Sequence, residues 1–169
     1  PSGNGYWLVA SDGGLFAFGD AVFHGSTGAI RLNQPIVGMA ATHTGRGYYL
    51  VARDGGIFAF GDATFAGSTG ALKLNKPMIA MAMTVSGKGY WLLAQDGGVF
   101  AFGDATFAGS PQSASIQAVG IVPTGTGGGY VIASSLGSVT SYGDAPKLAN
   151  VRDVLPTFTG RLIGIAGVS

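Results

Sequence analysis

All eight acidic residues of this sequence are Asp, and seven of them belong to two recurring sets that could hold a metal ion or bind a ligand. The first set is Asp12, Asp54 and Asp96, and the second is Asp20, Asp62, Asp104 and Asp144. A ring of carboxylates could bind Ca²⁺, which takes six to eight oxygen ligands. An Asp next to Gly between two strands also stabilises its own turn. We interpret the second set as turn residues, because it persists in a degenerate fourth copy, and we predict no metal site and no cofactor.

The first set of Asp residues is missing from the fourth copy, so these three carboxylates are our candidates for hydrogen bonds to a ligand. Cationic and amide side chains recur 42 residues apart on long loops that we expect at the same end of the molecule: Arg31 and Lys73, Asn33 and Asn75. Aromatic residues recur in the preceding strands: Trp7, Tyr49 and Trp91. Donors, carboxylates and aromatic faces together suit a carbohydrate. The alternatives are a solvated rim for the polar residues and core packing for the aromatic ones.

The residues that catalysis would need are not part of the recurring pattern. The two histidines, His24 and His43, are replaced by Ala or Val in the other copies. The sequence has no G-x-S-x-G or H-E-x-x-H motif, and the glycine run at 125–129 is not followed by the Lys-Ser/Thr of a phosphate-binding loop. We therefore predict that the protein is not an enzyme.

Composition excludes several further classes of partner. Charged residues make up 10% of the chain and the net charge is +1, which argues against nucleic acid. The sequence has no Cys, so it has no disulfides. No apolar run reaches the length of a membrane-spanning helix. Because the sequence begins with Pro1 rather than Met, we expect that a preceding segment has been removed.

A repeat of about 42 residues must position these side chains. Its register is marked by Tyr6, Tyr48, Tyr90 and Tyr130, which predicts an array of four similar units. Within the second unit, β-forming runs at 36–41, 48–52, 57–60 and 64–67 are separated by Gly-rich turns. Apolar runs without polar alternation indicate strands that are covered on both faces. We predict an all-β, four-bladed β-propeller with four strands in each blade.

The two ends of the sequence complement each other. The first unit has no inner strand, and residues 162–167 resemble the inner strand at 36–41 with nothing after them. Aligning the repeats places Pro1 and Ser169 at the same position. We predict one domain, 1–169, with blade 1 at 1–34 plus 161–169, blade 2 at 35–76, blade 3 at 77–115 and blade 4 at 116–160. We expect a monomer closed by the C-terminal strand; the alternatives are an open stack and a swapped C-terminal strand.

The motif at 5–21, 47–63 and 89–105 resembles the GYWLVASDGGIFAFGDA-type repeat of secreted and cell-surface actinobacterial proteins. The fourth copy departs from it, with Val131, Leu136 and Thr140 in place of the aromatic, Asp and Phe residues. The resemblance implies an extracellular, non-catalytic accessory module beside other domains of a larger chain. We expect it to bind polysaccharide or cell-wall glycan weakly and multivalently. The alternative is a structural or protein-interaction propeller that acts as a rigid spacer.

Overall fold

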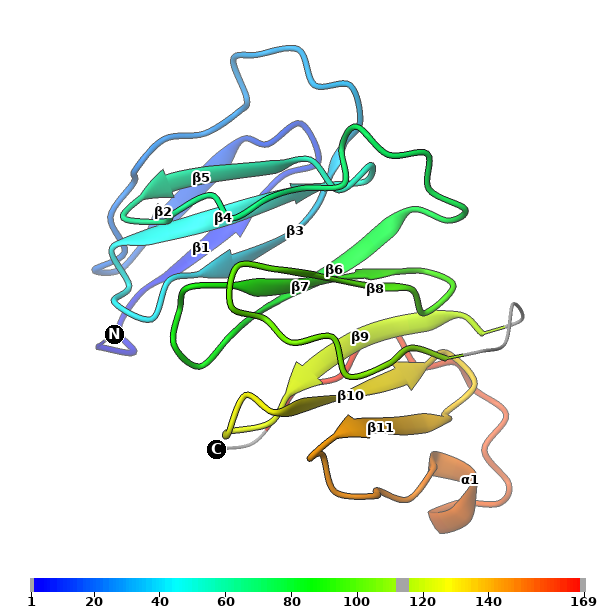
Figure 1. The fold of residues 1–169 in the computed structure, drawn as a ribbon. Coiled ribbons are helices and arrows are strands. Elements are labelled where there is room, and N and C mark those ends of the chain that lie inside the picture. The colour runs from blue at the N-terminus through cyan, green and yellow to red at the C-terminus, as the bar shows by residue number, and fades with distance from the viewer. Residues whose placement is uncertain (1, 112–115, 168–169) are drawn as a thin grey trace.

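The structure is a computed structural model that describes residues 2–111 and 116–167. Those residues form eleven strands in four antiparallel sheets that follow one another along a curved stack (Figure 1). The strands are β1 Tyr6–Val9, β2 Leu15–Phe18, β3 Ile36–Ala41, β4 Gly47–Ala52, β5 Ile57–Gly61, β6 Met78–Met83, β7 Tyr90–Ala94, β8 Val99–Phe102, β9 Ala118–Pro123, β10 Gly129–Ser134 and β11 Val139–Gly143. The sheets are β1-β2, β3-β4-β5, β6-β7-β8 and β9-β10-β11. The predicted all-β array of four blade-like sheets is confirmed.

The hairpins β1-β2, β4-β5, β7-β8 and β10-β11 join the second and third strand of each repeat unit, and each forms because glycine accepts a positive φ in its turn. Gly55 has φ +80° in the turn between β4 and β5, and its N–H donates to Ala52 O (2.8 Å). The equivalent glycine of the fourth sheet, Gly137, has φ +89°. The residue before it is Leu136, whereas the other three hairpins have Asp at that position. The hairpin therefore persists in the unit that lacks the carboxylate.

The prediction of four strands in each blade is wrong. The run at 64–67 and its equivalents in the other units, called here the fourth segment, form no strand among the described residues. Aromatic side chains bond the backbone of this segment instead of a neighbouring strand. Tyr49 Oη donates to Thr64 O (3.0 Å) and accepts from Thr64 N–H (2.9 Å). In the third unit, Trp91 Nε1 donates to Thr106 O (2.9 Å). Because side chains satisfy these groups, the segment needs no hydrogen-bonded ladder.

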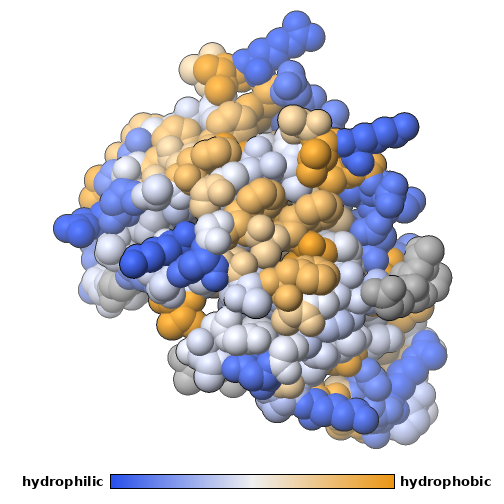
Figure 2. Space-filling view, in the orientation of Figure 1, coloured by the Kyte–Doolittle hydropathy of each residue, from blue (hydrophilic) through white to orange (hydrophobic). Residues whose placement is uncertain are grey.

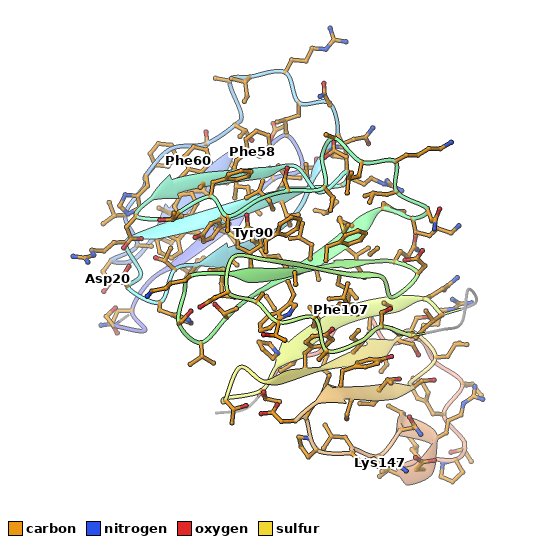
Figure 3. The ribbon with its side chains drawn as sticks, in the orientation of Figure 1. Asp20, Phe58, Phe60, Tyr90, Phe107 and Lys147 are labelled. Atoms are coloured by element: carbon orange, nitrogen blue, oxygen red, sulfur yellow. The ribbon has the colours of Figure 1, made fainter. Side chains whose placement is uncertain are left out.

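Neighbouring sheets pack through aromatic pairs that repeat along the stack. The ring centroids lie 5.4 Å apart for Trp7–Tyr48, 5.4 Å for Tyr49–Tyr90 and 5.7 Å for Trp91–Tyr130. Each tyrosine of the following sheet also reaches the fourth segment of the preceding unit: Tyr90 Oη donates to Gly67 O (2.5 Å). Tyr90 is fully buried, and burial raises its pKa, so its hydroxyl stays a neutral donor. Figure 3 shows Tyr90 between the second and third sheets.

Residues 162–167 lie beside the fourth sheet but form no strand. Leu162 N–H donates to Ser135 O (2.8 Å), and a Cβ on Gly120 would stand 2.7 Å from Ile165 Cγ2. The side chain of Ile163 is 96% exposed. The segment therefore occupies the place of the next inner strand, while closure of the ring stays a prediction. The predicted overlap of Pro1 with Ser169, and the blade boundary at 115, fall outside the described residues.

The described chain also contains one helical turn, α1 Val151–Val154, which leaves the fold all-β. Asn150 begins it: Asn150 N–H and the Asn150 side-chain amide both donate to Asp153 Oδ2, each at 2.9 Å. Among the described residues there is no helix of the length and apolarity that crossing a membrane requires. Figure 2 shows that apolar side chains remain exposed across one face of the molecule, between hydrophilic turns and linkers.

Candidate ligand-binding hollows at one end of the blades

The structure brings the predicted carboxylates and amides together at one end of the sheets. Asp12, Asp54 and Asp96 lie in the hairpins between second and third strands, and the linkers at 30–35 and 72–77 run past them. The two linkers lie at the same end of the strands (Figure 1), whereas Asp20 lies at the opposite end of the strands (Figure 3).

The first hollow lies between the β1-β2 hairpin and the linker that leaves the first unit. It has a volume of ≈ 320 Å³, and its polar groups come from Ser11, Asp12, Asn33 and Gln34. Ile30, Leu32 and Pro35 supply its apolar walls. Asp12 and Asn33 are both exposed, so an incoming polar group can reach them.

The second hollow, of ≈ 240 Å³, repeats the first one 42 residues further along the chain. Asp54 and Asn75 stand where Asp12 and Asn33 stand, and Leu72, Leu74 and Pro77 replace the apolar walls. The charge differs, because Arg53 and Lys76 take the places of Ser11 and Gln34. The hollows therefore share a carboxylate, an amide and an apolar wall, and only the second carries cations.

A third hollow, of ≈ 180 Å³, lies on the other side of the same linker. Asp96 faces Lys73 and Asn75 there, with Leu74 and Phe100 as apolar neighbours. Lys73 thus lines a hollow together with a predicted carboxylate. Arg31 lies on the first linker between Ile30 and Leu32, two residues that line the first hollow. The three hollows therefore contain the predicted carboxylates, both amides and Lys73.

Each hairpin carboxylate also stabilises its own turn. Asp12 Oδ1 accepts from Gly14 N–H (2.8 Å), Asp54 Oδ1 from Gly56 N–H (2.9 Å) and Asp96 Oδ1 from Gly98 N–H (3.1 Å). Two acceptor oxygens on each carboxylate allow a turn bond and a ligand bond at the same time.

The sugar-stacking role considered for Tyr49 and Trp91 is wrong in this structure, because both side chains are essentially fully buried between sheets. Trp7 is half-buried and lines a separate hollow of ≈ 330 Å³ at the opposite end, with Asp20 and Arg46. Its Nε1 donates to Val22 O (2.9 Å). These aromatics are packing residues, as the core alternative predicted.

The second set of Asp residues accepts hydrogen bonds from the turn that precedes the second strand of each unit. Asp104 Oδ1 accepts from Thr84 Oγ1 (2.9 Å), and Ser86 donates to its other oxygen. Thr42 and Thr44 do the same for Asp62. Hydrogen bonds from Ser86 and Thr84 lower the pKa of Asp104, and those from Thr44 and Thr42 lower that of Asp62. Their interpretation as turn residues agrees with these contacts.

Acid should weaken this turn. Because hydrogen bonds lower the folded-state pKa of Asp104, its contribution to stability is full above the unfolded pKa of about 3.9 and is lost as pH falls through the folded value. We expect Ser86→Ala to raise the Asp104 pKa toward its ordinary value, as followed by carboxyl NMR titration. Asp62 and Asp144 in the same spectra are internal controls. An unchanged Asp104 pKa in this variant would contradict the assignment.

Two further patterns in the sequence mark residues that the structure shows to be in contact or exposed. The Thr-x-Thr/Ser pairs at 42 and 44 and at 84 and 86 precede each second strand and mark the partners of the second Asp set. An exposed phenylalanine also recurs in the last segment of each of the first three units. Phe23, Phe65 and Phe107 are 56%, 57% and 56% exposed. Within the described part of the chain, no three acidic or His side chains gather where they could hold a metal ion.

No family model matches the sequence, and no curated protein matches it. Among solved structures, the fold is similar to the Cps50 (Swd1) β-propeller domain from Myceliophteria thermophila, with a TM-score of 0.52 and 9% sequence identity. The match covers 83% of this chain and 50% of that chain, so this chain spans about half the length of the propeller domain it matches. The similarity shows a β-propeller-like fold.

Proposed function

We propose that this protein is a non-catalytic accessory module that binds polysaccharide through the repeated hollows at the hairpin end of its blades. The observation that carries the proposal is the recurrence of one arrangement: Asp12 with Asn33 in the first hollow and Asp54 with Asn75 in the second. A carboxylate and an amide beside an apolar wall match the hydroxyls and C–H groups of a sugar ring. The resemblance to repeats of secreted proteins supports an extracellular or cell-surface location beside other domains.

The hollows are open and shallow, so each one alone should bind weakly. A polymer that reaches two or three hollows gains from the effective concentration of the second contact. Arg53 and Lys76 let the second hollow accept an acidic sugar, whereas the first hollow, with Ser11 and Gln34, suits a neutral one. The ligand class is therefore a neutral or weakly acidic polysaccharide.

Binding should rise with glycan length in the wild type and fall in a triple variant, Asp12→Asn/Asp54→Asn/Asp96→Asn. Asparagine retains an Oδ1 that can accept the turn N–H, so the hairpins should persist while the charged acceptors are lost. Calorimetric titration with short and long neutral and acidic oligosaccharides measures this, and we expect a loss of about tenfold or more for the long glycans. Asp20→Asn, at the opposite end, is the control for charge.

The alternative proposal is a rigid spacer between other domains. Its support is the turn bond that every one of the three hairpin carboxylates makes, which accounts for those residues without a ligand. Equal binding of long glycans by the triple variant and the wild type would reduce the carboxylates to turn residues. Failure of both proteins to bind any glycan would favour the spacer.

The fold proposal that accompanies this function is a closed propeller, in which residues 162–167 pair with β1. Within one chain, the pairing would give the predicted ring of four blades. Between chains, it would give a larger ring.

A further inference from the structure

The first sheet has one face that no other part of the described chain covers. This open face consists of Tyr6, Leu8, Phe16 and Phe18, and they are 56%, 53%, 57% and 44% exposed. The equivalent residues of the second sheet include Tyr48 and Leu50, which are 0% exposed. Phe58 and Phe60, the equivalents of Phe16 and Phe18, are half-buried. An apolar face that is covered in the following units and open in the first one indicates a missing neighbour.

The missing neighbour has a defined backbone contact. Where sheets adjoin, one residue of each hairpin links two inner strands: Arg53 N–H donates to Pro35 O, and Arg53 O accepts from Met78 N–H, each at 2.9 Å. Ser11 accepts from Ile36 N–H (2.8 Å) in the same way. By the repeat, the counterpart for Ser11 N–H is the carbonyl oxygen of Arg161. The strand that would complete the first sheet is therefore residues 162–167.

The place of this segment in the stack decides which copy of it can pair with β1. It lies beside β9, held by the Leu162–Ser135 bond, at the end of the stack away from the first sheet (Figure 1). The three sheet junctions repeat the same aromatic contacts and the same tyrosine-to-glycine bonds, so the sheets follow one another in one repeating arrangement. Over 83% of its length, the chain aligns with 50% of a β-propeller chain.

We propose that a second copy of this chain covers the open face. Residues 162–167 of each copy complete the first sheet of the other, and two half-rings close into one eight-bladed propeller. The exchange is a form of domain swapping, and closure leaves no free apolar face to extend the array. The assembly uses the open sheet face and the backbone of Ser11, whereas the proposed glycan hollows lie at the blade ends, where Ser11 lines the first one.

The absence of cysteine makes a direct test possible. The double variant Ser11→Cys/Arg161→Cys places two thiols at the predicted pairing position. Under oxidation we expect a covalent dimer on non-reducing gels and by mass spectrometry. Pro35→Cys/Arg53→Cys, at the equivalent contact within one chain, is the geometric control and should give an intramolecular bond. An intramolecular bond between positions 11 and 161, a ladder of higher oligomers or no bond would overturn the proposal.

Sedimentation velocity of the unmodified chain gives a second measurement. We expect a species of twice the 16.9 kDa chain mass that dissociates when Leu8 is replaced by Asp. Leu72→Asp is the matched control, since Leu72 is 57% exposed but lies on a linker, and it should leave the dimer intact. A wild-type monomer, or equal dissociation by both variants, would refute the two-copy ring. Should Leu8→Asp not fold, the cysteine result in the folded double variant still decides.

Discussion

Replacing Trp91 with alanine should cost about 3–5 kcal/mol of folding free energy, the range for removing a large aromatic side chain from a core. Trp91 is 0% exposed, packs against Tyr130 and donates from Nε1 to Thr106 O. Its loss leaves a cavity between the third and fourth sheets and an unpaired carbonyl. Thermal and denaturant unfolding should show a fall in Tm of about 10 °C or more.

Trp7 is a matched control for this variant, because it occupies the same repeat position. It makes the corresponding bond to Val22 O and the corresponding contact with Tyr48, but it is only half-buried. We expect Trp7→Ala to cost clearly less than Trp91→Ala. Trp91→Phe separates ring packing from the hydrogen bond and should fall between the two. Equal losses for Trp7→Ala and Trp91→Ala would show that burial between sheets is not what stabilises this position.

The arrangement of sheets could be predicted from the sequence because glycines and aromatics recur at the same positions in each unit. Gly13, Gly55, Gly97 and Gly137 all have positive φ, so the turn position carries conformational information that survives changes at neighbouring residues. The fourth segment could not be assigned correctly in this way. Its backbone partners are Tyr and Trp side chains from the same and the next unit, and a local β pattern does not distinguish such contacts from a ladder.

The candidate site was predictable in part for the same reason. A fixed period places Asp12 and Asn33 in the same geometry as Asp54 and Asn75, so the pairing of hairpin and linker follows from the repeat. Exposure of the aromatics does not follow from it. Trp7 and Trp91 share one motif, yet only Trp91 is fully buried. Trp91 lies opposite Ala82 of the inner strand β6, whereas the first sheet has only β1 and β2 and offers Trp7 no such neighbour. Exposure depends on neighbours that a single repeat does not encode.

Gly103→Ala should be among the most destabilising single-methyl changes in the protein, although Gly103 is exposed. Its φ is +68°, a region that costs an alanine about 1–2 kcal/mol. A Cβ would also stand 2.2 Å from Lys88 O and 2.8 Å from Gly89 Cα, both of them backbone atoms. Relieving that overlap requires the turn before Asp104 to open, which adds about 1–3 kcal/mol of overpacking strain.

Gly127→Ala separates the two causes, because Gly127 has a similar φ of +75° but its nearest neighbour for a Cβ is Val85 Cγ2 at 3.6 Å. We expect Gly127→Ala to show the cost of the left-handed conformation alone and Gly103→Ala to show that cost plus the clash. Denaturant unfolding of both variants measures the difference. Opening of the turn should also break the hydrogen bonds from Thr84 and Ser86, so the pKa of Asp104 should rise in Gly103→Ala. Equal stabilities for the two variants would mean that the turn relaxes freely, and the Asp104 hydrogen bonds would then not be what holds each second strand in register.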